Sequence, residues 1–105
     1  ERHQILMEKA KKILSNLKIN NIVFYYGDGM KGWPAKFSFE RIIITAVCKN
    51  LPIKIINQLE EGGILVLPLR YDNAQYITKV RKKNKKLYFK KYWRVRFVPL
   101  VSGIN

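Results

Sequence analysis

A carboxylate between two glycines is the feature of this chain best placed to bind a ligand. The tripeptide Gly27-Asp28-Gly29 directly follows Ile22–Tyr26, a β-branched and aromatic run that predicts a short strand. Open α/β sheets bind ligands just past the carboxyl ends of their strands. The Asp28 carboxylate could accept a hydrogen bond from an exocyclic amine such as that of adenine, and the glycines would let a flat ring approach the backbone. The same tripeptide also suits a plain tight turn.

The residue types that usually act as nucleophiles or zinc ligands are scarce. His3 and Cys48 are the only histidine and the only cysteine. A Cys–His nucleophilic pair needs a hydrogen bond between the two side chains, and nothing in their spacing predicts one. A structural zinc site needs four ligands, usually Cys or His. We therefore expect no metal site, and we expect Cys48 to be a buried or half-buried thiol.

Composition predicts one folded domain. The 105 residues are enough for a single core, and a hydrophobic fraction of 48% argues against disorder. One cysteine excludes an internal disulfide and fits a reducing, cytoplasmic compartment. No apolar run approaches the roughly 20 residues that span a bilayer.

The charge balance is strongly basic. The chain carries 21 Lys and Arg against 7 Asp and Glu, a formal charge of +14. Such a balance suggests a polyanionic partner, because Lys and Arg displace counterions from phosphates. The alternative is a solvated surface in a lysine-rich proteome, and the spread of Ile, Lys and Asn along the whole chain favours it.

Periodicity predicts an α/β order. Gln4–Leu17 carries an apolar stripe at helical spacing, which predicts an amphipathic helix packed on a core. After the glycine-rich loop Gly27–Ser38, Arg41–Ala46 predicts a second strand, whose unbroken isoleucines suit burial on both faces. Pro52 is expected to open a helix that runs to Leu59. Ile64–Leu67 predicts a third strand.

The last third of the chain predicts a hairpin. Gln75–Lys82 and Leu87–Val98 read as two long strands around a polar turn at Lys83–Lys86. Alternation in the second strand puts Trp93 on the apolar face, which predicts that Trp93 lies in the core. The whole order indicates a doubly wound α/β sheet that ends in an antiparallel pair.

Four blocks in order resemble one family. They are Gly27-Asp28-Gly29 with Gly32-Trp33, Phe39–Ala46, Leu59–Pro68 and Val95–Val101. Together they resemble the isoaspartyl methyltransferases, over essentially all 105 residues. That family uses S-adenosylmethionine to methylate the carboxyl group of L-isoaspartyl and D-aspartyl residues in damaged proteins. The first and last blocks are its more specific marks, since the Gly-Gly-strand element recurs in many class I methyltransferases.

The resemblance implies a set of binding residues. It assigns Glu1 to the ribose, Asp28 with Gly29 to the adenine, and the backbone of Thr45 and Ala46 to the surroundings of the sulfonium. It implies that the substrate edge consists of Arg96, Phe97, Val98, Pro99 and Leu100, although Phe97 also suits the core of the last strand. No catalytic side chain is named, because an ionised carboxylate is already a nucleophile and positioning supplies much of the rate.

The resemblance also implies an incomplete sheet. Glu1 would end the second strand of a class I (Rossmann-like) sheet, about 20 residues beyond the glycine loop, so that loop and the central first strand would lie upstream. Residues 1–105 are then the C-terminal part of a single methyltransferase domain, inactive alone. We expect this part to be marginally stable or to pair strands with another copy, since unpaired buried backbone groups cost about 1–3 kcal/mol each.

The chain departs from the family pattern at one place, and two other functions stay open. Val47–Asn50 replaces the small residues and proline usual after the Thr-Ala strand end. One alternative is a basic nucleic-acid-binding module, supported by the lysines interleaved with Tyr88, Tyr92 and Trp93. The other is an inactive remnant of the methyltransferase.

Overall fold

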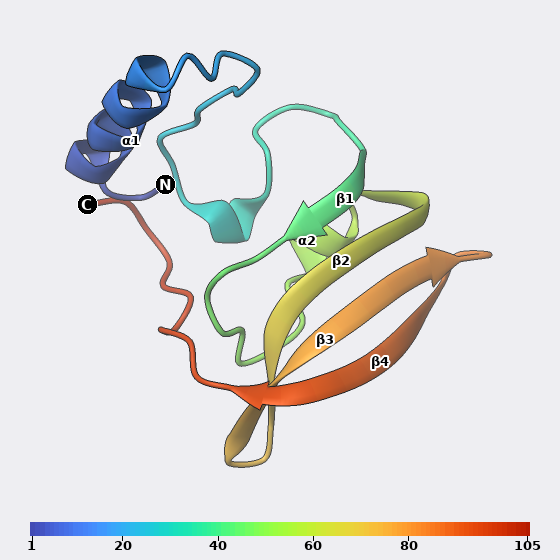
Figure 1. Ribbon diagram of the computed structural model, residues 1–105. Helices are drawn as coiled ribbons and strands as arrows, with labels where there is room; N and C mark the ends of the chain where they lie inside the picture. Colours follow the sequence, from blue (N-terminus) through green and yellow to red (C-terminus); the bar gives the residue numbers. More distant parts are fainter. The chain divides into compact units, whose positions relative to one another are not determined.

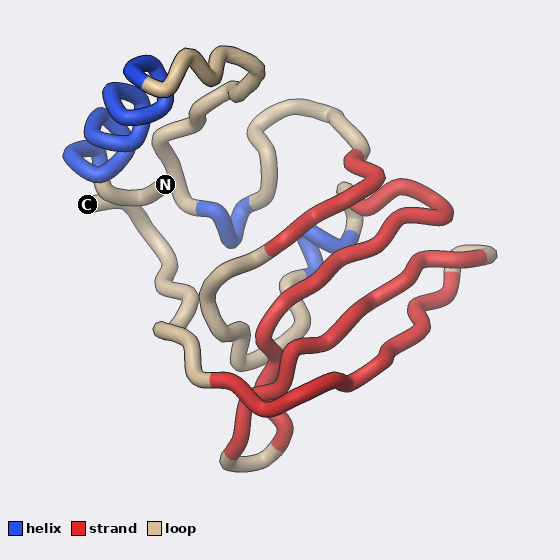
Figure 2. The backbone as a smooth tube through the Cα atoms, in the orientation of Figure 1, coloured by secondary structure: helices blue, strands red, loops and turns tan.

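The computed structural model describes all residues 1–105, in two compact units. The terminal unit comprises Glu1–Gly29 with Ser102–Asn105, and the sheet unit comprises Met30–Val101. A 3-10 turn, η1 (Gly29–Lys31), lies where the chain leaves the first unit. No helix is both long and apolar enough to cross a membrane. Figures 1 and 2 show the helix of the terminal unit and the strands of the sheet unit.

The terminal unit is built on the predicted helix. Helix α1 (Gln4–Asn16) ends in a Schellman motif, in which the N–H of Ile19 bonds the carbonyl of Leu14 and Lys18 takes the left-handed conformation. Its apolar stripe is not the core face that periodicity predicts. Met7 alone is buried, whereas Leu6 and Leu17 are more than half exposed. The unit has too little chain to cover the helix.

The strand predicted at Ile22–Tyr26 is not a strand in the structure. The segment pairs through its backbone with Glu1 only. The Glu1 amino group donates to the Tyr25 carbonyl (3.1 Å), and the N–H of Gly27 donates to the Glu1 carbonyl (3.0 Å). This is the hydrogen-bond pattern of a parallel ladder, one rung long. A strand needs a neighbour along its length, and Glu1 supplies only this rung, so Val23 stays 78% exposed.

The sheet unit is a four-stranded mixed sheet in chain order (Figure 1). Strand β1 (Phe39–Ile43) pairs parallel to β2 (Leu59–Tyr71), and short α2 (Ile53–Ile56) connects them. Strands β3 (Ala74–Lys83) and β4 (Lys86–Val95) follow as antiparallel neighbours. The expected α/β sheet with a closing hairpin is therefore confirmed.

Several expected boundaries are wrong. The strand expected at Arg41–Ala46 is β1, which ends at Ile43, and the strand expected to end at Val98 is β4, which ends at Val95. The helix expected from Pro52 to Leu59 is only four residues long, and β2 begins at Leu59 rather than Ile64. The reason lies at Gly62-Gly63, where an irregular register lets β2 bulge against β1. Gly62 has φ +81°, and a Cβ on Gly63 would lie 2.7 Å from the Glu60 carbonyl oxygen. The glycines therefore bend a strand here and do not stop a helix.

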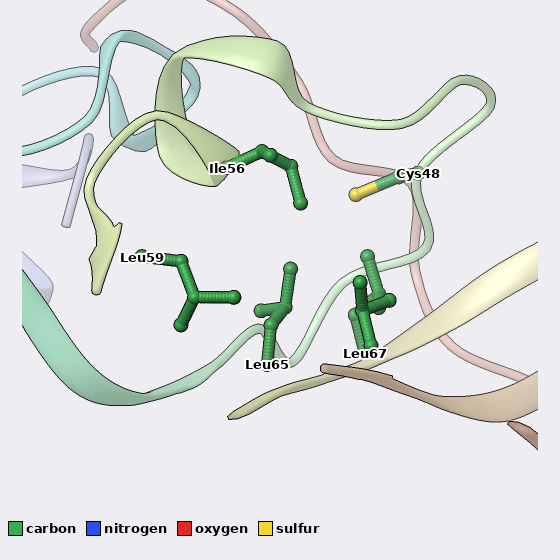
Figure 3. Close-up of a cluster of buried hydrophobic side chains, with 6 residues drawn as sticks. Cys48, Ile56, Leu59, Leu65 and Leu67 are labelled. Atoms are coloured by element: carbon green, nitrogen blue, oxygen red, sulfur yellow. The ribbon is translucent and has the colours of Figure 1, made fainter. Parts of the chain in front are cut away.

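The core covers one face of the sheet. Leu65, Leu67 and Val80 are completely buried. Figure 3 shows Ile56 of α2, Cys48 and Leu59 gathered around Leu65 and Leu67 of β2. The opposite face is open, and Ile43 of β1 is 73% exposed. The expectation that Arg41–Ala46 is buried on both faces is therefore wrong for this unit.

The β3–β4 hairpin has a tight turn and a bulge. Asn84 and Lys85 both have positive φ, as a type I′ turn requires, and the Glu61 carboxylate accepts the backbone N–H groups of both. The register slips between Tyr76 and Thr78, so β4 has one extra residue there. An extra residue reverses the alternation of faces. Trp93 is consequently 66% exposed, and its predicted core position is wrong.

We predict that Leu65→Ala lowers the free energy of unfolding of the full-length protein by about 2–5 kcal/mol, because truncating a fully buried leucine leaves a cavity. Ile43→Ala is the matched control on the exposed face and should cost less than about 1 kcal/mol. Urea titration measures both. Equal losses would show that the core is not where the structure places it.

Candidate functional site

Two carboxylates named by the sequence analysis belong to the terminal unit. Glu1 pairs through its backbone with Tyr25 and Gly27, directly before Asp28. The Glu1 side chain is exposed, and its Oε1 accepts the backbone N–H of His3 at 2.8 Å. Asp28 is only 8% exposed, and its Oδ2 accepts the N–H of Gly103 at 2.9 Å. Both carboxylates therefore belong to this unit, and their roles at the cofactor stay predictions.

The two glycines beside Asp28 serve different purposes. A Cβ on Gly27 would lie 2.4 Å from the Tyr25 ring, so packing within the unit demands glycine there. A Cβ on Gly29 would meet nothing within 4 Å. The close approach of a flat ligand ring, which the sequence suggests for both, therefore has space at Gly29 only.

The end of the chain forms part of this group, which sequence reasoning missed. Besides the Gly103 bond to Asp28, Arg2 Nε donates to the Gly103 carbonyl (3.0 Å), and the Asn105 N–H donates to the Arg2 carbonyl (2.7 Å). The Tyr26 hydroxyl bonds the Asn105 carbonyl oxygen at 3.2 Å. No residue pattern in Ser102–Asn105 signals these contacts, because most of them use backbone groups.

The sheet unit brings two of the predicted regions together. The N–H of Val47 donates to the Val98 carbonyl (2.8 Å), and the N–H of Leu100 donates to the Val47 carbonyl (2.9 Å). This parallel bridge places the expected substrate edge, 96–100, against the residue that follows Thr45 and Ala46. Thr45 is exposed and Ala46 half-buried, so both border solvent beside the edge.

The expected substrate edge is mixed in exposure. Phe97 and Leu100 are half-buried, while Arg96, Val98 and Pro99 are exposed, Val98 by 70%. Half-burial fits both interpretations of Phe97, as a core side chain and as part of an edge. Two residues of Val47–Asn50, the segment where we expect a departure from the family pattern, lie beneath this edge. Val47 and Cys48 are 4% and 3% exposed.

Two glutamine side chains hold backbone segments in place, and sequence reasoning missed both. Gln75 accepts the N–H of Phe97 with Oε1 (2.7 Å) and donates to the Phe97 carbonyl with Nε2 (3.2 Å). Gln58 does the same for Trp33, at 2.7 and 2.8 Å. A side-chain amide offers the same donor and acceptor as a peptide group. Each glutamine thus pairs with a loop as a strand residue would.

The Gln58 clamp explains the Gly32-Trp33 block. Gly32 has φ +75°, and a Cβ there would lie 2.5 Å from Gln58 Oε1, so only glycine lets the amide reach Trp33. An open pocket of about 630 Å³ lies beside the clamp. Its lining consists of Trp33, Pro34, Ala35, Lys36, Phe37, Ser38, Asn57 and Gln58.

Cys48 and His3 have separate surroundings. Burial raises the pKa of the Cys48 thiol above its ordinary value, and Sγ lies 4.0 Å from the Ala46 carbonyl oxygen. His3 belongs to the terminal unit, where its ring contacts Arg2 Nη1 and Asn105 Nδ2, both at 3.1 Å. A protonated, buried thiol is a poor nucleophile. The expectation of a buried Cys48 is confirmed.

Comparison with known proteins assigns this geometry to a known fold. The sequence model of the protein-L-isoaspartate(D-aspartate) O-methyltransferases matches residues 1–105. Protein-L-isoaspartate O-methyltransferases of Shewanella halifaxensis and Parvibaculum lavamentivorans are 40% and 36% identical over 98% and 99% of the chain. The chain spans about half the length of these curated relatives, 48% of each.

Solved structures show the same fold. A crystal structure from Plasmodium falciparum, assigned to protein-L-isoaspartate O-methyltransferase and in complex with S-adenosyl-L-homocysteine, superposes with a TM-score of 0.84 at 24% identity. It covers 96% of this chain and 50% of its own. A second protein-L-isoaspartate O-methyltransferase gives 0.80 at 28% identity, over 91% of this chain and 31% of its own. The predicted Rossmann-like methyltransferase sheet is thereby confirmed.

We predict that Gln75→Met speeds amide hydrogen exchange at Phe97 by at least about tenfold, because two hydrogen bonds of roughly 0.5–1.5 kcal/mol each are lost. Gln58→Met is the reciprocal control and should act on Trp33 instead. Exchange followed by NMR on the full-length protein reads both sites. If either variant loosened both segments equally, the clamps would not be local.

The buried thiol predicts a pH dependence of stability. Below its ordinary pKa of about 8.5, the thiol is neutral in both the folded and the unfolded protein. At higher pH the unfolded chain loses the proton while the folded protein keeps it, so the free energy of unfolding falls until the raised pKa is passed. Urea titrations across this range should show the advantage of wild type over Cys48→Ala shrinking. A constant difference between the two proteins would contradict the prediction.

Proposed function

The chain belongs to the protein-L-isoaspartate(D-aspartate) O-methyltransferase family, and on that premise we propose that the protein methylates the carboxyl group of L-isoaspartyl and D-aspartyl residues in damaged proteins, with S-adenosylmethionine as methyl donor. The observation that carries the proposal is the family match over every residue of the chain. The chain spans half of its relatives' length, so the proposal concerns the activity of the full-length protein.

In the terminal unit, we assign the cofactor's polar ends to the two carboxylates. Glu1 would accept from the ribose hydroxyls, and its exposed side chain leaves it accessible. Asp28 would accept from the adenine amine, in addition to or in place of the Gly103 N–H that Oδ2 accepts now. The open space at Gly29 supports the passage of an adenine ring beside it. Bound there, S-adenosylmethionine supplies a methyl group on a positively charged sulfur.

In the sheet unit, we assign the substrate to the edge at 96–100, and the surroundings of the cofactor's sulfonium to the backbone of Thr45 and Ala46. The parallel bridge at Val47 fixes these two stretches against each other and supports a shared role. The exposed Arg96 would attract the substrate carboxylate. An isoaspartyl carboxylate is ionised at neutral pH, so no protein base is required. Its oxygen bonds the methyl carbon while the methyl–sulfur bond breaks, and the product is a neutral ester.

The chain's task in this reaction is therefore positioning. Holding the carboxylate oxygen in line with the methyl carbon supplies much of the rate of such a displacement. The Gln75 clamp on Phe97 and the bridge at Val47 would keep the edge rigid enough for that alignment. A single free cysteine fits the cytoplasm, where we propose that the enzyme repairs damaged proteins.

The direct experiment is a methyl-transfer assay with the full-length protein. Tritiated S-adenosylmethionine is offered with a peptide that contains one L-isoaspartyl residue and, separately, with its ordinary aspartyl counterpart. We expect base-labile methyl ester on the isoaspartyl peptide and none on the aspartyl one. Labelling of both peptides, or of neither, would overturn the proposal.

We predict that Glu1→Ala weakens binding of S-adenosylhomocysteine by at least about tenfold, because a charge-assisted hydrogen bond contributes roughly 1.5–3 kcal/mol. Glu8→Ala is the control. Glu8 lies on α1 and contacts only Lys11, at 3.7 Å, so binding should change by less than about twofold. Isothermal titration calorimetry on the full-length protein measures both. Unchanged affinity in Glu1→Ala would remove the ribose assignment and leave the methyl-transfer proposal standing.

A further inference from the structure

The β3–β4 hairpin holds most of the chain's excess positive charge. Residues 79–96 contain ten Lys and Arg and no Asp or Glu. Directly paired residues of an antiparallel ladder lie on the same face of a sheet. Three rungs therefore share the face opposite the core, and we call them the basic ladder. They are Lys79 with Lys90, Arg81 with Tyr88, and Lys83 with Lys86.

Two of these rungs oppose like charges. Lys79 faces Lys90 and Lys83 faces Lys86, an arrangement that destabilises a sheet. No ion pair joins a carboxylate to a residue of the basic ladder; the pair between Lys11 and Glu8 lies on α1. Glu61, the carboxylate at the hairpin turn, accepts backbone N–H groups with both of its oxygens. The repulsion is therefore not relieved within the molecule.

The lysines on the opposite face behave differently. Lys82 donates its Nζ to the Ile56 carbonyl at 2.7 Å. Lys91 lies over the rings of Tyr76 and Tyr71, at 4.6 and 5.1 Å. These cations have partners inside the sheet unit. In the basic ladder, only Lys90 contacts a ring, that of Tyr92 at 5.1 Å, so the ladder's charge is directed to solvent.

The spacing of the ladder suits an extended polyanion. Alternate residues of a strand lie about 6.6 Å apart, so the cations of the ladder repeat along an extended line. A flexible single strand can follow such a line with its phosphates. Tyr88 stands among these cations and is 52% exposed, which leaves its ring accessible to a base. Basic grooves with exposed aromatic rings are how single strands are bound without sequence preference.

We infer that the basic ladder of the β3–β4 hairpin binds single-stranded nucleic acid, with its lysines and Arg81 on the phosphates and Tyr88 stacked on a base. This ligand is separate from the substrate of the proposed methyl transfer. An acidic protein would satisfy the charges but would gain little from the exposed Tyr88 ring, which is why we favour a nucleic acid. The binding site lies wholly within the sheet unit.

Fluorescence anisotropy of the full-length protein with a labelled oligouridylate of about 20 nucleotides tests the inference. Contacts to about four phosphates predict that affinity falls roughly 50-fold between 50 and 200 mM salt. The triple variant Lys79→Gln, Lys83→Gln, Lys90→Gln should bind at least about tenfold more weakly and flatten that salt dependence by about two units of slope. Its control is Lys9→Gln, Lys12→Gln, Lys54→Gln, with the same change of charge at exposed sites outside the hairpin. If both triple variants lost affinity equally, binding would follow net charge and the site would not exist.

A pair of aromatic variants separates nucleic acid from other polyanions. Tyr88→Leu should weaken oligouridylate binding at least about fivefold through lost stacking. Phe89→Leu is the matched control, because Phe89 is the next residue, 51% exposed, on the other face. Duplex RNA of equal length should bind both variants alike. Loss of affinity in neither variant, or equally tight binding of polyglutamate, would overturn the inference in favour of a general polyanion or an acidic protein.

Discussion

The constraint on which the sheet unit depends is that β2 is hydrogen-bonded on both sides. β1 pairs parallel to it at Ile64–Val66 and β3 pairs antiparallel from Ile64 to Tyr71, so the centre of β2 has neighbours on both sides. Leu65 and Leu67 can then lie on the core face with no contact to solvent. α2, Cys48 and Leu59 pack on these two side chains (Figure 3). Gly62 and Gly63 allow this pairing by letting β2 bend where its register with β1 is irregular.

The candidate substrate edge is held by backbone pairing more than by side-chain packing. Val47 bonds both Val98 and Leu100, and Cys48 forms a further bridge to Leu69 of β2. The edge is thus tied to the central strand through two buried residues. Both residues lie in Val47–Asn50, where we expect the chain to depart from the family pattern. A change at either position would alter what lies beneath the edge.

The sequence predicts those parts of the structure that depend on local pattern. The helix α1, the hairpin and the burial of Cys48 follow from periodicity, turn residues and composition. It does not predict features that depend on neighbours in space. Ile22–Tyr26 has the composition of a strand but only one rung of pairing. Trp93 alternates with apolar residues in the sequence, but it lies where the register of β4 slips. The Gln75 and Gln58 clamps have no sequence signature, because a glutamine in a strand or loop looks the same with or without its partner.

The Gln75 clamp has a geometric consequence for the evolution of the edge. Gln75 pairs with Val95 through its backbone and with Phe97 through its side chain, so the ladder continues past the end of β4 without the strand itself continuing. The length of one side chain therefore sets how far Phe97 stands from the sheet. Asparagine, the other side chain with an amide, is one methylene shorter and could make both bonds only to a segment that lies nearer the sheet. A substitution at position 75 can therefore change the distance between Phe97 and the sheet, although Gln75 is not itself a residue of the edge.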